Sequence, residues 1–164
     1  MSDYIGTEFV KGSYDEDLYT TIARWCNTTQ KARIIEHDNK YIVEAIPAPT
    51  FKELKIAKYN EIAAARYDAE TGGIDVDGAR IATDRGSQAL LTAAVVMARL
   101  DPEFKTRWKC ADGHFVALDA FQLRSIGDAV LAHVEACFAR EGELCELIDA
   151  ATTPEELDAI RWSL

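Results

Sequence analysis

The sequence predicts an α+β fold in which a small αββ module precedes a mainly α-helical domain with two short β-hairpins. Three observations support this: β-rich runs flank a polar turn early in the chain, a Pro-Ala-Pro segment follows, and helical apolar patterns fill most of the remainder. We therefore expect a module at 1–46, a linker at 47–50 and a helical domain at 51–164. A chain of 164 residues has room for such a domain with a small appendage.

The N-terminal module is predicted from one helix signal and one hairpin signal. A capping-box pattern, in which a serine side chain accepts from a backbone amide and a glutamate reaches back, spans Ser13 to Glu16. Apolar residues then share one helical face as far as about Cys26. The runs RIIE and KYIVEAI are rich in β-branched residues and flank the polar stretch 37–39, which predicts a hairpin.

The linker and the first long helix follow from proline and glycine. Pro47 and Pro49 lack an amide donor and force the preceding residue out of helical geometry. A second capping box, from Thr50 to Glu53, opens a helix that Gly72-Gly73 ends. The apolar residues on or near one face of this helix are Leu54, Ala57, Ile62, Ala65 and Ala69.

Two stretches set thirty-five residues apart, DVDGARIATD (75–84) and CADGHFVALD (110–119), follow the same pattern. Each has Asp-Gly, then a β-branched residue followed by alanine, and then a final aspartate. Asp-Gly favours a type I′ turn, so 74–82 and 107–118 are predicted as tight hairpins. The final aspartate of each stretch is expected to cap the helix that follows it. Duplication of a hairpin-plus-helix unit would explain the similarity of the two stretches. Independent convergence on residues that suit hairpin turns and helix caps would explain it equally well.

The two helices after these hairpins differ in pattern. The helix from Arg85 to about Leu100 is apolar nearly all around, which predicts burial on most sides. The helix from Ala120 to about Ala150 has an apolar stripe, with further apolar residues beside it. Unless Gly142 bends that helix, it has more apolar surface than one neighbour covers, and dimerisation or trimerisation into a homo-oligomer, or docking on another protein, could bury the rest. The stripe comprises Ile126, Val130, Val134, Cys137, Leu144 and Ile148, and the residues beside it are Phe121, Leu131 and Phe138.

A last capping box begins at Thr153, with Pro154 at the favoured first helical position. It predicts a short helix near the end of the sequence. Apolar residues then anchor this segment to the rest of the helical domain: Leu157, Ile160 and Trp162.

Charge and hydropathy exclude several classes of function. With 18 basic and 28 acidic residues the net charge is −10, which opposes binding to nucleic acid. The segment 135–158 has eight acidic residues and one arginine, typical either of a solvated helical face or of a docking surface for a basic partner. The longest apolar run, 89–98, is too short to cross a membrane, and no signal-peptide pattern is present, so we expect cytoplasmic synthesis.

A zinc site is the strongest metal candidate in the sequence. Cys110, His114, His133 and Cys137 supply two cysteines and two histidines, but their Cys-x3-His and His-x3-Cys spacings lack a tight CxxC knuckle. We therefore expect free buried thiols, ordinary histidines and no metal. The stretch 68–79 begins like an EF-hand loop but ends in alanine where a glutamate is needed.

No catalytic motif is present in the sequence. It contains no GxSxG, HExxH, GxxxxGK[ST] or GxGxxG element. We expect a protein that is not an enzyme, with no catalytic residues and no cofactor.

Five stretches together resemble an uncharacterised domain of phage and prophage proteins that is encoded with, or fused to, tail-fibre assembly proteins. In order they are EIAAARYDAE, IDVDGARIATDRGSQALL, TRWKCADGHFVALDA, AHVEACFAREGEL and IDAATTPEELDAIRW, within about 51–162. The segments ARWCN and YIVEAIPAP resemble, more loosely, modules that precede this domain. Cys110, Cys137 and Cys145 fall outside the pattern, and the resemblance supplies no catalytic residues.

The resemblance implies a non-enzymatic tail-fibre assembly protein, either a chaperone or a fibre-associated factor. Its partner would be a phage tail-fibre protein, met in the host cytoplasm during assembly, and the chain could stay in the virion tail. A structural subunit of the virion tail or fibre is one alternative, and a small metal-binding or regulatory phage protein is another. The predicted partner contacts are Phe121, Leu131 and Phe138, with Glu141, Glu143 and Glu146 as rim charges; alternatively, the three apolar residues are plain core.

Overall fold

The computed structural model describes residues 3–164 and confirms the α+β class. The chain divides into two compact units, Met1–Thr50 and Phe51–Leu164. The segment 46–50, where the two prolines lie, has no helix or strand.

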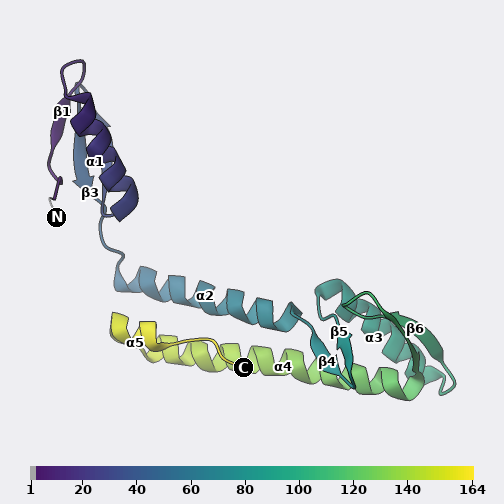
Figure 1. Ribbon diagram of the computed structural model, residues 1–164. Helices are drawn as coiled ribbons and strands as arrows, with labels where there is room; N and C mark the ends of the chain where they lie inside the picture. Colours follow the sequence, from purple (N-terminus) through teal and green to yellow (C-terminus); the bar gives the residue numbers. More distant parts are fainter. Residues whose placement is uncertain (1–2) are drawn as a thin grey trace. The chain divides into compact units, whose positions relative to one another are not determined.

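The first unit is a βαββ module (Figure 1). Its elements are β1 (Glu8–Val10), α1 (Glu16–Thr29), β2 (Ala32–His37) and β3 (Lys40–Ala45). The three strands form an antiparallel sheet in the order β1-β3-β2. The predicted αββ pattern was therefore wrong by one strand: β1 has only three residues, too few to show a period-two pattern.

Helix α1 begins later than the sequence predicted. Its N-cap is Asp15, not Ser13, and the Asp15 carboxylate accepts from the amides of Asp17 and Leu18, both at 3.0 Å. Asp and Ser are about equally good N-caps, so local sequence does not choose between them. The helix then packs on the sheet, where a small aromatic-rich core gathers around Phe9, Ile22, Cys26, Ala32 and Val43.

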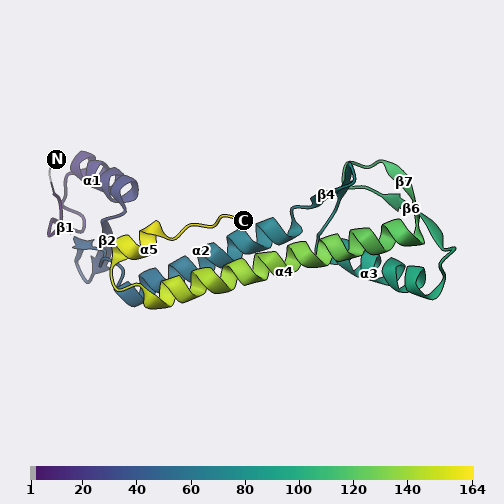
Figure 2. The ribbon, with the colours of Figure 1, turned by 90° about the horizontal axis from the view of Figure 1, so that it is seen from below.

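The second unit is built on two long helices, α2 (Phe51–Thr71) and α4 (Ala120–Ala150), which run side by side (Figures 1 and 2). They are antiparallel, because Lys55 near the start of α2 donates to the carbonyl of Asp149 near the end of α4. The short helix α5 (Pro154–Ala159) packs against α2. The buried residues of this half are Ile62, Leu144, Ile148, Ala151, Leu157 and Ile160.

The other half of the second unit surrounds the N-terminal part of α4. It contains the hairpin β4 (Ile74–Val76) and β5 (Ala79–Ile81), helix α3 (Arg85–Leu100), and the hairpin β6 (Lys105–Lys109) and β7 (Phe115–Asp119). Figure 2 shows α3 and the second hairpin at the opposite end of α4 from α5. A second core joins these elements through Ile81, Leu91, Leu118, Leu123, Ile126 and Val130.

The two Asp-Gly turns have different geometry. Asp77 (φ 50°) and Gly78 (φ 80°) both have positive φ, as the predicted type I′ turn requires. At the second turn only Gly113 (φ 91°) does. Its amide donates to the carbonyl of Cys110 at 2.9 Å, and the Cys110 amide donates to the carbonyl of His114 at 2.8 Å. This loop has three residues and ends in a glycine bulge, so the type I′ prediction was wrong there.

The caps after both hairpins are confirmed. Asp84 accepts from the amides of Gly86 and Ser87 at the start of α3, and Asp119 forms a capping box with Gln122 at the start of α4. Thr153 caps α5 in the same way. These side chains fix where the helices begin.

Helix α3 is not buried on most sides, which corrects the prediction from its composition. Only Leu91 and Ala98 are buried, because α3 lies at the edge of the unit and packs mainly on α4. Leu90, Val96, Met97 and Leu100 are exposed.

The two glycines of α4 predict opposite effects of substitution by alanine. A Cβ at Gly127 would lie 2.6 Å from Cγ2 of Val95, whereas one at Gly142 would have no neighbour within 4 Å. Gly142→Ala should therefore raise the free energy of unfolding by about 1 kcal/mol through helix propensity. Gly127→Ala should lower it by about 1 kcal/mol, because a β-branched side chain yields little space. Chemical denaturation tests both, and equal gains would contradict the close approach of α3 to α4.

Candidate interaction surface

The three predicted apolar contact residues are all exposed and none belongs to the core. Phe121 is 73%, Leu131 57% and Phe138 46% exposed. Leu131 and Phe138 are seven residues apart and share one side of α4. Phe121 lies about 80° around the helix from Leu131, so the three do not form one patch.

Leu131 borders a groove of about 320 Å³ between α3 and α4. Leu91 and Val130 are buried in it, whereas Val96 and Leu131 are exposed. Gly127 and Val95 both line the groove, and a Cβ at Gly127 would lie 2.6 Å from Cγ2 of Val95. Its apolar lining comprises Leu91, Val95, Val96, Val130, Leu131 and Val134.

Phe138 lies further along α4 and is partly covered by an arginine from α2. The guanidinium of Arg66 is 4.6 Å from the centre of the Phe138 ring and 6.0 Å from that of Tyr67. Its Nε donates to Glu141 at 3.0 Å. Glu141, which was predicted to be a rim charge, therefore pairs with Arg66 and helps to hold its guanidinium over the Phe138 ring.

The other two predicted rim charges also differ from each other. Glu143 accepts from Nη1 of Arg140 at 2.8 Å. Glu146 is exposed and has no ion pair with any residue of the described range 3–164. Of the three, Glu146 alone keeps a carboxylate free for a partner.

A buried carboxylate that sequence analysis did not single out joins α2 to α3. Glu70 is 1% exposed. Arg66 donates to its Oε2, while Arg85 Nε and Gln88 Nε2 both lie 3.4 Å from its Oε1. The hydroxyl of buried Thr83 donates to the Glu70 backbone carbonyl at 2.5 Å. Because its charge is paired and hydrogen-bonded, we assign Glu70 a structural role, in which it connects α2 to the start of α3.

The four candidate zinc ligands do not gather. His133 Nε2 lies 3.0 Å from the carbonyl of Ala69 and 3.8 Å from Sγ of Cys137. Cys110 and His114 belong to the β6–β7 loop. Across residues 3–164, no three His, Cys, Asp or Glu side chains are arranged to hold a metal ion.

The four cysteines are free thiols and differ in access. Cys26, Cys110 and Cys137 are buried, and Cys145 is partly exposed. Burial raises the pKa of the Cys145 thiol, and the carboxylates of Glu141 and Asp149 raise it further. At neutral pH we expect one slowly modified thiol in the native chain and four after denaturation. Ellman's reagent measures this. Cys145→Ser should abolish the native reaction, and a second native thiol reacting as fast would contradict the burial pattern.

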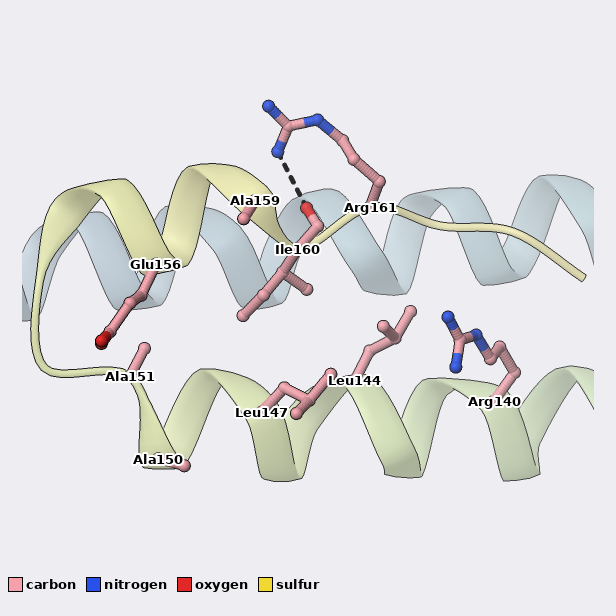
Figure 3. Close-up of a pocket in the computed structure, with 9 residues that line it drawn as sticks. All are labelled: Arg140, Leu144, Leu147, Ala150, Ala151, Glu156, Ala159, Ile160 and Arg161. Carbon is pink, nitrogen blue, oxygen red and sulfur yellow. Dashed lines mark hydrogen bonds between the residues drawn. The ribbon is translucent and has the colours of Figure 1, made fainter.

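A cavity of about 550 Å³ lies between α4 and α5 (Figure 3). Leu144, Leu147 and Ile160 point into it. The polar residues at its edge are already engaged: Arg161 donates to the carbonyl of Ile160 at 2.8 Å, and Glu156 accepts from the amides of Thr152 and Thr153. Those amides hold the pKa of Glu156 below its usual value. The cavity is therefore an apolar cleft without converging free polar groups.

A model of one protein family, described as a domain of unknown function (DUF4376), matches residues 53–161. This is more than half of the 164 residues. The chain belongs to the DUF4376 family. The DUF4376 match runs from the first turn of α2 to just beyond α5, so it contains the α3–α4 groove and leaves the βαββ module outside.

No curated protein and no solved structure matches the chain. In the part of the chain that the structure describes, no helix is both long enough and apolar enough to span a bilayer.

Proposed function

We propose that this DUF4376 protein is a non-enzymatic tail-fibre assembly factor, which binds fibre chains through the α3–α4 groove in the host cytoplasm. The observation behind this is the open apolar groove, with Leu131 and Val96 exposed on its two sides. Exposed apolar surface of this kind is typical of protein interaction sites. The resemblance of five stretches in 51–162 to a phage domain found with tail-fibre assembly proteins supports the choice of partner.

The charge of the chain is compatible with this role. A protein that offers apolar surface to partly folded partners must not aggregate with itself. A net charge of −10 makes copies of the chain repel one another, which opposes aggregation.

Co-expression with a phage tail-fibre chain tests the proposal. We expect the soluble trimeric yield of the fibre to rise, and Leu131→Gln in the groove to abolish the rise. Leu147→Gln, which changes an exposed leucine on another side of the same helix, should leave the rise intact.

An unchanged fibre yield would contradict the assembly role. If the chain were then recovered from purified particles, it would be a structural subunit of the virion instead.

A further inference from the structure

We infer that the α3–α4 groove binds one amphipathic helix of a partner, with an apolar stripe in the groove and lysine or arginine along the edge that faces α4. The inference rests on the proposed function, since it takes the groove as the docking site and specifies what enters it.

The dimensions of the groove fit about three helical turns. Along α3 its lining extends from Gln88 to Arg99, which at 1.5 Å per residue is about 16 Å. Apolar side chains spaced by three and four residues on a bound helix would meet the exposed walls at Val96 and Leu131.

The uncharged polar side chains of the groove, Gln88 and Thr92, favour a helix over an extended peptide. Thr92 donates its hydroxyl to the carbonyl of Gln88 at 2.8 Å, and Gln88 donates Nε2 to the carbonyl of Thr83 at 2.7 Å. These side-chain donors are therefore already used. An extended peptide needs partners for its backbone amides and carbonyls, whereas a helix satisfies its own.

The charge along α4 specifies a basic edge on the partner. Asp128 lines the groove, and Glu135 follows one heptad later on the same side of α4; both are exposed. Neither forms an ion pair with any residue from 3 to 164. Lysine or arginine on the partner would neutralise them. A second copy of this chain fits less well, because two surfaces of a protein with charge −10 would meet.

Two synthetic peptides of about 14 residues test this with the full chain. One has leucine at positions a and d of two heptads and lysine elsewhere, and its twin has glutamate in place of every lysine. At about 150 mM salt, fluorescence anisotropy should show saturable binding of the lysine peptide and at least roughly tenfold weaker binding of the glutamate peptide.

Groove variants and matched controls separate docking from general attraction to an acidic protein. Leu131→Gln should weaken binding of the lysine peptide roughly tenfold, and the double change Asp128→Asn with Glu135→Gln roughly fivefold. Leu147→Gln, and Asp158→Asn with Glu155→Gln, remove the same groups elsewhere and should leave binding of the lysine peptide within about twofold. Circular dichroism checks that each variant is folded.

Three results would overturn the inference: equal binding of the two peptides, equal effects of groove and control variants, or a dimer of this chain that Leu131→Gln dissociates. If the fibre yield still rose on co-expression, the inference alone would fail and the assembly role would stand. If the lysine peptide bound specifically but the chain had no effect on fibre yield, the groove would bind a basic amphipathic helix as inferred. The proposed role in fibre assembly would then be contradicted.

Discussion

Glu70→Ala should lower the free energy of unfolding by about 3 kcal/mol. The Glu70 carboxylate is buried between α2 and α3, where Arg66, Arg85 and Gln88 surround it. Removing it leaves the mostly buried Arg66 guanidinium with Glu141 as its remaining acidic partner. Denaturation of the full chain, followed by circular dichroism, measures the loss.

Glu143→Ala is the matched control for this prediction. Glu143 lies on α4 and accepts from Arg140 at 2.8 Å, and solvent reaches both side chains. An ion pair of this kind contributes less than about 1 kcal/mol. Equal losses for the two variants would show that Glu70 is not buried in a paired network.

Leu144→Ala is the second substitution for which we expect a large loss, of about 3 kcal/mol. Leu144 is 1% exposed and packs with Ile62, Ile148 and Ile160 where α2, α4 and α5 meet. Its truncation removes apolar contacts and leaves a cavity that the neighbouring helices cannot fill.

Leu147→Ala, three residues later, provides the comparison. Leu147 is 52% exposed, so its truncation should lower the free energy of unfolding by less than about 1 kcal/mol. The difference between these two leucines tests the rotation of α4 about its axis. A larger loss at Leu147 than at Leu144 would mean that α4 turns another face toward the core.

Most of the helical framework could be predicted from local sequence. The predicted limits of α3 and α4, 85–100 and 120–150, agree with the structure because capping aspartates mark where both helices begin. The helix after Thr153 also follows from its capping box. Such signals depend on side chains reaching backbone atoms a few residues away, so they are visible in sequence.

The features that the sequence did not reveal depend on long-range packing. The surface position of α3 depends on how many elements surround it, and its composition does not encode that number. The three-residue strand β1 is defined by its pairing with β3, thirty-two residues further along. The second Asp-Gly turn also differs from the first, although both contain the same dipeptide.

The candidate surface was predicted only in part. The apolar stripe of α4 correctly separates Leu131 and Phe138 from the core, because helical periodicity places them beside it. The groove itself needs α3, whose position the sequence does not give. Glu141 was predicted to be a rim charge of the partner contact, but it pairs with Arg66, which is seventy-five residues away on α2 and beyond the reach of pattern analysis.

Photo-crosslinking during fibre assembly tests most directly the claim that this chain acts by holding another polypeptide in the α3–α4 groove. A benzophenone amino acid would replace Leu131 in one variant and Leu147 in another, each co-expressed with the fibre chain and irradiated. We expect a crosslink to the fibre chain from position 131 and not from position 147. Equal crosslinking from both positions, or a crosslink from position 147 alone, would contradict that claim.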